Sequence, residues 1–261
     1  MTGVRPKKYL GQHFLHDKEI ARKIVSSLEA KQCKNILEIG PGTGVLTDLL
    51  ITRQEKDLWL IDIDQESIRY LEEKYPDHNT NIIHGDFLKI NLKTLFNGDF
   101  SIIGNLPYNI SSQIFFRVLE LRDCVPEMVC MIQKEVADRI VSPPGNKTYG
   151  ILSVLLQAFY DIIYLSTVKP GAFHPPPKVN SAVIKLTRNG TQQLACDESL
   201  FFRVVKQGFQ NRRKTLRNAL KPINLPEQIK QHPMLSLRAE QLSVADFVSL
   251  TSKIEALWMS E

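Results

Sequence analysis

A cluster of three glycines, Gly40-Pro41-Gly42-Thr43-Gly44, places the strongest constraint on the fold of this chain. It follows residues 35–39, which read as a buried strand, and precedes the apolar residues 45–51, which read as a helix. Glycines at such a turn let the backbone approach a ligand closely. The spacing is one residue shorter than the dinucleotide fingerprint, and Glu38 would repel a pyrophosphate. The Glu38 carboxylate therefore favours a cationic ligand, such as the amino acid end of S-adenosylmethionine, which Gly40 and Gly42 would allow to approach the backbone. A purely structural turn is the alternative.

Strand and helix patterns alternate from this turn to residue 186. Further strands are predicted at residues 58–62, 81–84, 100–104, 128–132, 162–168 and 182–186. Helices are predicted at residues 65–74, 111–121, 134–140 and 150–159. This alternation predicts an α/β fold with a doubly wound, mostly parallel sheet. The last two strands are joined without a helix, so we expect an antiparallel hairpin at one edge.

The composition changes near residue 189, where Thr191-Gln192-Gln193 reads as a linker. The remaining chain shows helix patterns without strands, with two late helices around residues 226–232 and 243–258. We therefore expect two domains, residues 1–189 with the sheet and residues 190–261 with helices only.

Basic side chains in the second predicted domain lie beside apolar residues at helical spacing, and we expect a helix break at residues 210–214. A basic helical face suits a phosphate backbone, such as that of RNA, although a solvated surface is the alternative. The candidate RNA-binding residues are Arg203, Lys206, Arg212, Arg213, Lys214, Arg217 and Lys221. The net charge of +5 and the pI near 8.9 also suit a polyanionic partner.

Acidic residues follow two of the predicted strands. Asp62 ends the strand about twenty residues beyond the glycines, where a ribose-binding carboxylate is expected. Asp64 is expected to cap the next helix. Asp86 is placed to accept the adenine amino group of the cofactor, while Phe87 packs on the adenine ring. An ordinary Gly-Asp turn is the alternative for this pair.

The stretch Asn105-Leu106-Pro107-Tyr108 follows the apolar residues 100–104 and supplies groups that suit an aromatic amine. The Asn105 amide oxygen and the Leu106 carbonyl can each accept one N–H of that amine. Pro107 restricts the backbone around this carbonyl, and Tyr108 offers a ring for stacking on the base. Phe173, in a loop with four nearby prolines, is a candidate for the other face of the base. A strand-ending turn and a core position for Phe173 are the alternatives.

Composition excludes several other classes of protein. No apolar run approaches the length of a membrane span, and residues 1–8 lack the apolar core of a signal peptide. The four cysteines form no metal-binding spacing, so we expect no metal and a reduced cytoplasmic location. Nothing in the sequence indicates more than a monomer.

Six stretches together resemble the small-subunit ribosomal RNA adenine dimethyltransferase family over nearly the whole chain. They are residues 8–15, 38–44, 104–112, 133–137, 173–179 and 212–218. The resemblance implies a class I methyltransferase fold, a small helical domain and S-adenosylmethionine as methyl donor. It also implies a substrate, two adjacent adenosines in the hairpin loop near the 3′ end of 16S rRNA, each dimethylated on N6 during small-subunit biogenesis.

By motif position, the resemblance implies cofactor contacts for His13, Leu15, Gly40, Asp62, Asp86 and Asn105. The family more often has Glu at the Asp62 position, and either Asn or His at the His13 position. Three alternatives stay open: a large-subunit methylase of the erythromycin-resistance type, a DNA adenine or protein glutamine methyltransferase, and a ribosome assembly factor with a secondary methyltransferase site.

Overall fold

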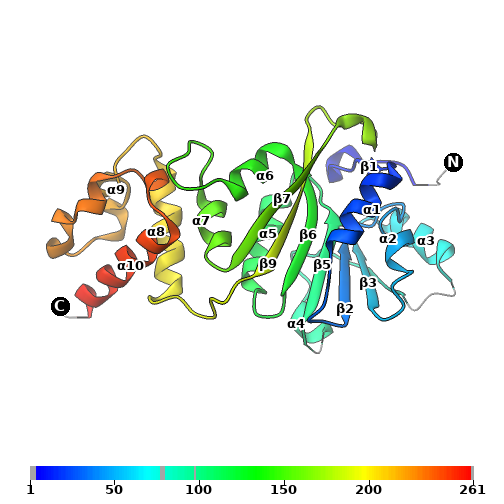
Figure 1. The fold of residues 1–261 in the computed structure, drawn as a ribbon, viewed down its shortest axis with the longest axis horizontal. Helices are drawn as coiled ribbons and strands as arrows, with labels where there is room; N and C mark the ends of the chain where they lie inside the picture. The colour runs from blue at the N-terminus through cyan, green and yellow to red at the C-terminus, as the bar shows by residue number, and fades with distance from the viewer. Residues whose placement is uncertain (1–3, 77–79, 97, 260–261) are drawn as a thin grey trace. The chain divides into compact units, whose positions relative to one another are not determined.

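The computed structural model describes residues 4–76, 80–96 and 98–259. Seven strands form one sheet in the order β4-β3-β2-β5-β6-β9-β7 (Figure 1). The strands are β2 (Asn35–Ile39), β3 (Asp57–Asp62), β4 (Thr80–His84), β5 (Phe100–Asn105), β6 (Glu127–Gln133), β7 (Tyr160–Val168) and β9 (Ser181–Arg188). The pairs from β4 through β6 are parallel, whereas β9 is antiparallel to β6 and neighbours β7 at the edge. The predicted doubly wound α/β fold is confirmed.

The strand order reverses direction beside β2. From β2 the chain passes to β3 and β4 on one side, and then crosses to β5 and β6 on the other. In open α/β sheets, ligands bind beyond the carboxyl ends of the strands at such a switch point. A separate two-stranded sheet joins β1 (Phe14–Leu15) to β8 (Phe173–His174), bringing together segments far apart in the sequence.

The helices are α1 (Lys18–Ser27), α2 (Thr47–Leu50), α3 (Gln65–Lys74), α4 (Leu92–Leu95), α5 (Ser111–Glu120), α6 (Lys134–Val141), α7 (Ile151–Gln157), α8 (Glu198–Gln210), α9 (Leu216–Ala219) and α10 (Val244–Trp258). Asp64 caps α3 by accepting the Glu66 N–H at 3.0 Å, as predicted. The expected break at residues 210–214 is confirmed, because turns separate α8 from α9.

Two predicted helices differ from the observed elements. The helix predicted at residues 45–51 is reduced to α2, since Gly44 has a φ of +81°, which a right-handed helix does not allow. The segment predicted as a helix at residues 226–232 forms a short 3-10 helix, Glu227–Gln231. It lies between Pro226 and Pro233, and the residue before a proline is biased away from the helical conformation.

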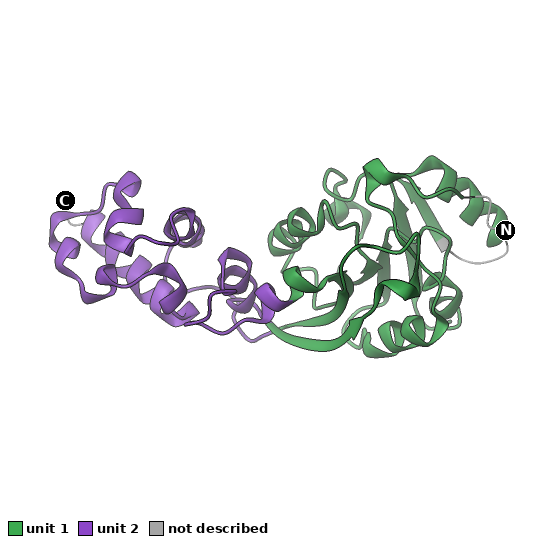
Figure 2. Ribbon diagram, turned by 90° about the horizontal axis from the view of Figure 1, so that it is seen from above, with its two compact units in different colours: residues 1–137, 161–188 green, residues 138–160, 189–261 purple. Residues whose placement is uncertain are grey.

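The chain divides into two compact units (Figure 2). Unit 1 comprises residues 1–137 and 161–188, and unit 2 comprises residues 138–160 and 189–261. The boundary expected after residue 189 lies one residue from the observed one, but residues 138–160 group with the helical unit. The physical reason is that α7 packs against α8 and α10.

The core of unit 1 surrounds the central strands, and every residue of β5 before Asn105 is buried. On one face of the sheet, Leu28, Leu60 and Val129 belong to a single buried cluster. Among the described residues, no helix is both long and apolar enough to cross a membrane.

Candidate active site

A cavity of about 160 Å³ lies at the carboxyl ends of β2, β3 and β5. Nine of the residues predicted for the cofactor or the target base line it together. They are His13, Gly40, Gly42, Asp62, Asp86, Asn105, Leu106, Pro107 and Tyr108. Segments that are up to about a hundred residues apart in the sequence therefore line one cavity.

Asn105 is the last residue of β5, and its side chain is oriented by residues 7–14, which we call the N-terminal arm. Its amide Nδ2 donates to the backbone carbonyl of His13 at 2.8 Å. This bond fixes which way the amide points and leaves Oδ1 as the acceptor. The following peptide is anchored as well, because the Leu106 N–H donates to the Met131 carbonyl of β6 at 3.0 Å.

Tyr108 is held at both ends of its side chain. Its hydroxyl is hydrogen bonded to Ser181 Oγ on β9, and its ring lies 5.3 Å from the His13 ring at an interplanar angle of 31°. The His13 ring is itself fixed by a 2.7 Å hydrogen bond between Nδ1 and the Pro175 carbonyl. Burial raises the pKa of Tyr108, so its phenol is neutral at physiological pH.

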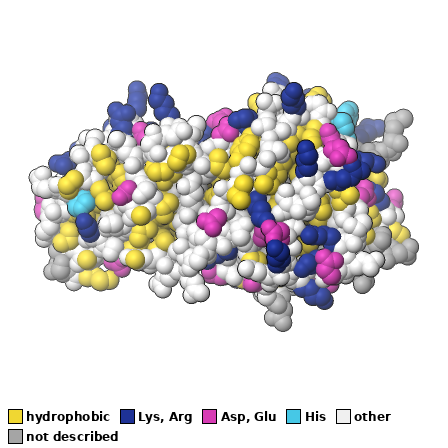
Figure 3. Space-filling view, viewed as in Figure 1, with side chains coloured by type: hydrophobic (Ala, Val, Ile, Leu, Met, Phe, Trp, Pro, Cys, Tyr) yellow, Lys and Arg dark blue, Asp and Glu magenta, His cyan; other side chains and the backbone are white. Residues whose placement is uncertain are grey.

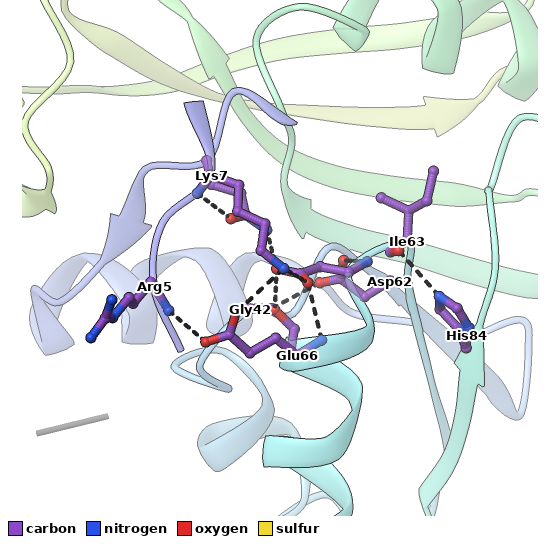
Figure 4. A network of polar contacts seen from close by, with 10 residues as sticks. Arg5, Lys7, Gly42, Asp62, Ile63, Glu66 and His84 are labelled. Atoms are coloured by element: carbon purple, nitrogen blue, oxygen red, sulfur yellow. Dashed lines mark hydrogen bonds and ion pairs between the residues drawn. The ribbon is translucent and has the colours of Figure 1, made fainter. Parts of the chain in front are cut away.

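The glycine turn and Asp62 form one hydrogen-bonded unit (Figure 4). The Gly42 N–H donates to Asp62 Oδ2 at 3.3 Å, and the Asp64 N–H donates to Oδ1 at 2.9 Å. Gly42 has a φ of +56°, and a Cβ there would lie 2.8 Å from the Phe14 ring. Asp62 is 7% exposed, and desolvation raises its pKa to about 6 in spite of these backbone hydrogen bonds.

Asp86 both shapes its own turn and lines the cavity. Its Oδ1 accepts the Leu88 N–H at 2.9 Å, and its Oδ2 lies 3.6 Å from Lys89 Nζ. Asp86 therefore forms the Gly-Asp turn that was the structural alternative, and it also lines the cavity.

Four predicted site residues do not line the cavity. Leu15, Phe87 and Phe173 are buried, and Leu15 and Phe173 oppose each other across the β1–β8 pair. Phe173 is 3% exposed and packs in the core cluster, which was the alternative position for it. Glu38 is also buried, and it accepts a 2.7 Å hydrogen bond from Thr47 Oγ1.

Several cavity residues were not identified from the sequence. Ile63 lines the cavity and is 51% exposed, although it is apolar. Leu88 and Gln12 contribute further wall. Ile63 could have been identified because it is an apolar residue directly after the acidic end of β3. The position of Gln12 could not, because it depends on how the N-terminal arm packs against the sheet.

The predicted RNA-binding residues all belong to unit 2, and all are exposed. Figure 3, seen from the same direction as Figure 1, shows basic side chains projecting from unit 2. Arg212 has a structural contact, because its guanidinium donates to the backbone carbonyls of Lys147 at 2.8 Å and of Tyr149. Arg217 and Lys221 line a cavity of about 530 Å³ together with Lys230 and Glu227.

Neither a metal site nor a disulfide is found in the part of the chain that the structure describes. No group of three or more His, Cys, Asp or Glu side chains in it is suited to hold a metal ion. All four cysteines are free.

Comparisons with known proteins identify relatives along nearly the whole chain. The family model described as ribosomal RNA adenine dimethylase matches residues 3–255. The ribosomal RNA small subunit methyltransferase A of Cytophaga hutchinsonii is 54% identical over 255 residues, covering 97% of this chain and 99% of its own. That of Flavobacterium johnsoniae is 54% identical over 257 residues, covering 98% of each chain.

Solved structures agree with this fold. A dimethyladenosine transferase from Plasmodium falciparum has a TM-score of 0.76 at 26% identity, covering 91% of this chain and 96% of its own. The 23S rRNA methyltransferase ErmE has a TM-score of 0.67 at 24% identity, covering 91% of this chain and 99% of its own. The ErmE likeness shows the fold alone.

Proposed function

The chain belongs to the ribosomal RNA adenine dimethylase family, and we propose that it dimethylates N6 of two adjacent adenosines in the hairpin loop near the 3′ end of 16S rRNA. S-adenosylmethionine is the proposed methyl donor. The observation that carries the proposal is the cavity itself, in which the Asn105 amide and the Leu106 peptide meet the glycine turn and Asp62. We further propose that the protein acts in the cytoplasm, as a monomer, on immature small subunits.

The residues of the cavity fit the proposed donor. The Asp62 carboxylate lies at the end of β3, where it can accept hydrogen bonds from the ribose hydroxyls. Asp86 can accept a hydrogen bond from the adenine amino group. The exposed Ile63 gives the adenine ring an apolar surface between them. Positive φ angles at Gly40 and Gly42 bring the backbone close to the donor, which supplies a methyl group on an activated sulfonium when bound.

Asn105 and Leu106 prepare the amine of the target base. The amide oxygen and the carbonyl each accept one N–H, favouring a pyramidal N6 whose lone pair points at the methyl group. With the donor bound, N6 would gain the methyl group and S-adenosylhomocysteine would leave with the electron pair of the carbon–sulfur bond, while water would take the proton from the more acidic product amine. In the second transfer one acceptor has no N–H partner, so the pocket must tolerate a methyl group there.

Holding the base requires that it leave its stack in the RNA, at a cost of a few kcal/mol. Tyr108 offers a ring whose hydroxyl end is fixed by Ser181, and stacking on such a ring contributes about 1–3 kcal/mol per base. Stacking on Phe173 stays a prediction, because it requires this ring to leave its buried position. The exposed basic residues of unit 2 are the proposed contacts to the RNA backbone.

The variant Asn105→Ala tests the proposal. We expect it to lower methyl transfer to immature small subunits by about 10²–10³-fold, while binding of the subunits changes less than about twofold. The measurement uses labelled donor, with large subunits and DNA as alternative acceptors. Asn91→Ala, an exposed position in unit 1 whose side chain makes no capping hydrogen bond to any described residue, is the matched control. Equal loss of transfer and subunit binding in Asn105→Ala, or label in large subunits or DNA instead, would reject the proposal.

A further inference from the structure

The N-terminal arm supplies one wall of the cavity. Residues 10–14 line it, although every other lining segment comes from the sheet and its connections. Two of the contacts that hold the arm were described above, the bond from Asn105 to the His13 carbonyl and the bond from His13 to Pro175. A third attachment lies at the amino end of α3.

This third attachment is a network of charged and polar groups (Figure 4). Lys7 Nζ forms ion pairs with Asp64 Oδ1 and, at 3.3 Å, with Glu66 Oε2. Gln12 Nε2 donates to Asp64 Oδ2 at 3.1 Å, and Gln12 Oε1 accepts the Lys7 N–H at 2.8 Å. The Asp64 side chain is 1% exposed, so its charge needs these partners.

Asp64 also contacts the proposed ribose acceptor. Its backbone N–H donates to Asp62 Oδ1 at 2.9 Å, while its carboxylate accepts from Lys7 and Gln12. Burial alone would raise the pKa of Asp64, but the hydrogen bonds from Lys7, Gln12 and the Glu66 N–H, together with the charge of Lys7, lower that pKa. A single residue therefore joins the arm to the carboxylate at the end of β3.

We propose that Lys7 and Gln12 are positioning residues for the methyl donor, holding the arm against Asp64 so that the cavity is closed and Asp62 is correctly oriented. This inference rests on the proposed function. Without the attachment the arm is closed for only part of the time, and the apparent affinity for the donor falls in proportion to that fraction. The chemistry at Asn105 is unaffected once the arm is closed.

The test compares Lys7→Met with Lys8→Met. Lys8 is the adjacent, exposed lysine, and no ion pair to it is found within the described parts of the chain. S-adenosylhomocysteine is the probe, with its dissociation constant measured by calorimetry, and kcat and KM are measured with the donor and small subunits. For Lys7→Met we expect about 5- to 20-fold weaker binding and a similar rise in KM for the donor, with kcat within about twofold. Lys8→Met is expected to match the wild type.

Two further variants separate positioning from a general loss of stability. Lys7→Arg keeps the charge and is expected to restore most of the affinity. Asp64→Asn keeps a helix-capping side chain on α3 while removing the charge, so combining it with Lys7→Met is expected to weaken binding little beyond either change alone.

The outcomes distinguish the inference from the proposed function. If Lys7→Met and Lys8→Met bind S-adenosylhomocysteine equally well, the inference is wrong but the proposed function stands. The same holds if Lys7→Met lowers kcat and leaves KM for the donor unchanged. Failure of Lys7→Arg to restore affinity, together with a lowered unfolding temperature of both Lys7 variants, also overturns the inference. Wild-type protein that binds no S-adenosylhomocysteine overturns the proposed function, and the inference with it.

Discussion

Glu38 shows how the environment of one side chain changes its chemistry. It lies in β2, two residues before Gly40, and is 1% exposed. Burial is the main cause that raises its pKa to about 8, while the hydrogen bond from Thr47 lowers the pKa only partly. The folded protein therefore retains a proton on Glu38 that the unfolded chain releases at about pH 4.5. Because the folded state binds more protons between these values, this group makes the protein less stable as the pH rises.

Glu38→Gln replaces the titrating carboxyl with an amide of similar shape. From about pH 5 to about pH 8 the wild type is expected to lose up to about 1.4 kcal/mol of unfolding free energy per pH unit from this site. The variant is expected to lack this contribution, so its unfolding temperature should vary less over the same range. Thermal unfolding at several pH values measures the difference.

Glu29→Gln is the control for that measurement. Hydrogen bonds from Lys185 and Lys31 lower the pKa of Glu29 to about 2. Its stabilising effect is therefore present above about pH 4.5 and is lost as the pH falls through about 2. Between pH 5 and pH 8, Glu29→Gln should therefore show the same change of unfolding temperature with pH as the wild type. Parallel curves for Glu38→Gln and the wild type would contradict the assignment.

The sequence located the residues that end strands better than it located residues whose neighbours come from distant segments of the chain. Asp62 was predicted from its spacing to the glycine turn and Asn105 from the chemistry of the stretch that it begins. Both end parallel strands at one edge of the sheet, and both line the cavity. Glu38 lies in a strand whose last four residues are all buried, so no alternation indicated which way it points. The position of Phe173 depends on its pairing with Leu15 across the β1–β8 sheet, which local pattern cannot reveal.

At the scale of elements, the approach of β5 to β2 depends on Gly104. A Cβ at this position would lie 2.5 Å from the Ile39 carbonyl oxygen and 3.2 Å from Leu106 Cδ2. The first of these neighbours is backbone and cannot move without shifting β2. Gly104 therefore allows the strand that ends in Asn105 to pass close to the strand that leads into the glycine turn.

Gly104→Ala is expected to destabilise the protein by about 1–3 kcal/mol and to lower its unfolding temperature by several degrees. It should also reduce methyl transfer, because any shift of β5 displaces Asn105. Gly171→Ala is the matched control in unit 1, where an added Cβ would meet no atom within 4 Å among the described residues. Thermal unfolding and transfer assays on both variants make the comparison. The explanation fails if the two variants behave alike.

Element boundaries were predictable wherever the hydrophobic pattern and a capping or turn residue indicated the same position. Strand 35–39 and helix 65–74 have the observed bounds, the second because Asp64 provides a cap at its start. The helix predicted at residues 243–258 is confirmed as α10, whereas residues 216–242 were less predictable. Their short 3-10 helices, such as Pro233–Ser236, are set by prolines and by packing rather than by an amphipathic period.

For the whole molecule, the proposed function divides between the two units. Unit 1 contains the cavity, and unit 2 contains the exposed basic residues proposed to contact RNA. The distribution of charge was readable from the sequence, because it requires no knowledge of contacts. The role of Arg212 was not, since it donates to a carbonyl 63 positions earlier in the chain. Its loss is therefore expected to disturb the segment around Tyr149 as well as RNA binding.

Arg213 and Lys214 offer a cleaner test, because both are exposed and no ion pair to either is found in the described residues. Each phosphate contact that is lost removes about 0.7–0.9 from the slope of log affinity against log salt concentration. The double variant Arg213→Ala, Lys214→Ala is therefore expected to reduce this slope by up to about 2 for small-subunit RNA. Its affinity for S-adenosylhomocysteine should stay within about twofold, because the donor site lies in unit 1.

The control for this variant removes the same charge from unit 1. Lys23 and Lys93 are exposed there, and the double variant Lys23→Ala, Lys93→Ala lowers the net charge of +5 by the same two units. If general attraction between a basic protein and RNA explained the binding, both double variants would change the salt dependence equally. A localised contact surface instead predicts a change only for Arg213 and Lys214, since screening confines the effect of a charge to about 10 Å at 0.1 M salt. Binding measured at several salt concentrations therefore decides whether RNA is bound by the positions of these charges or by their sum.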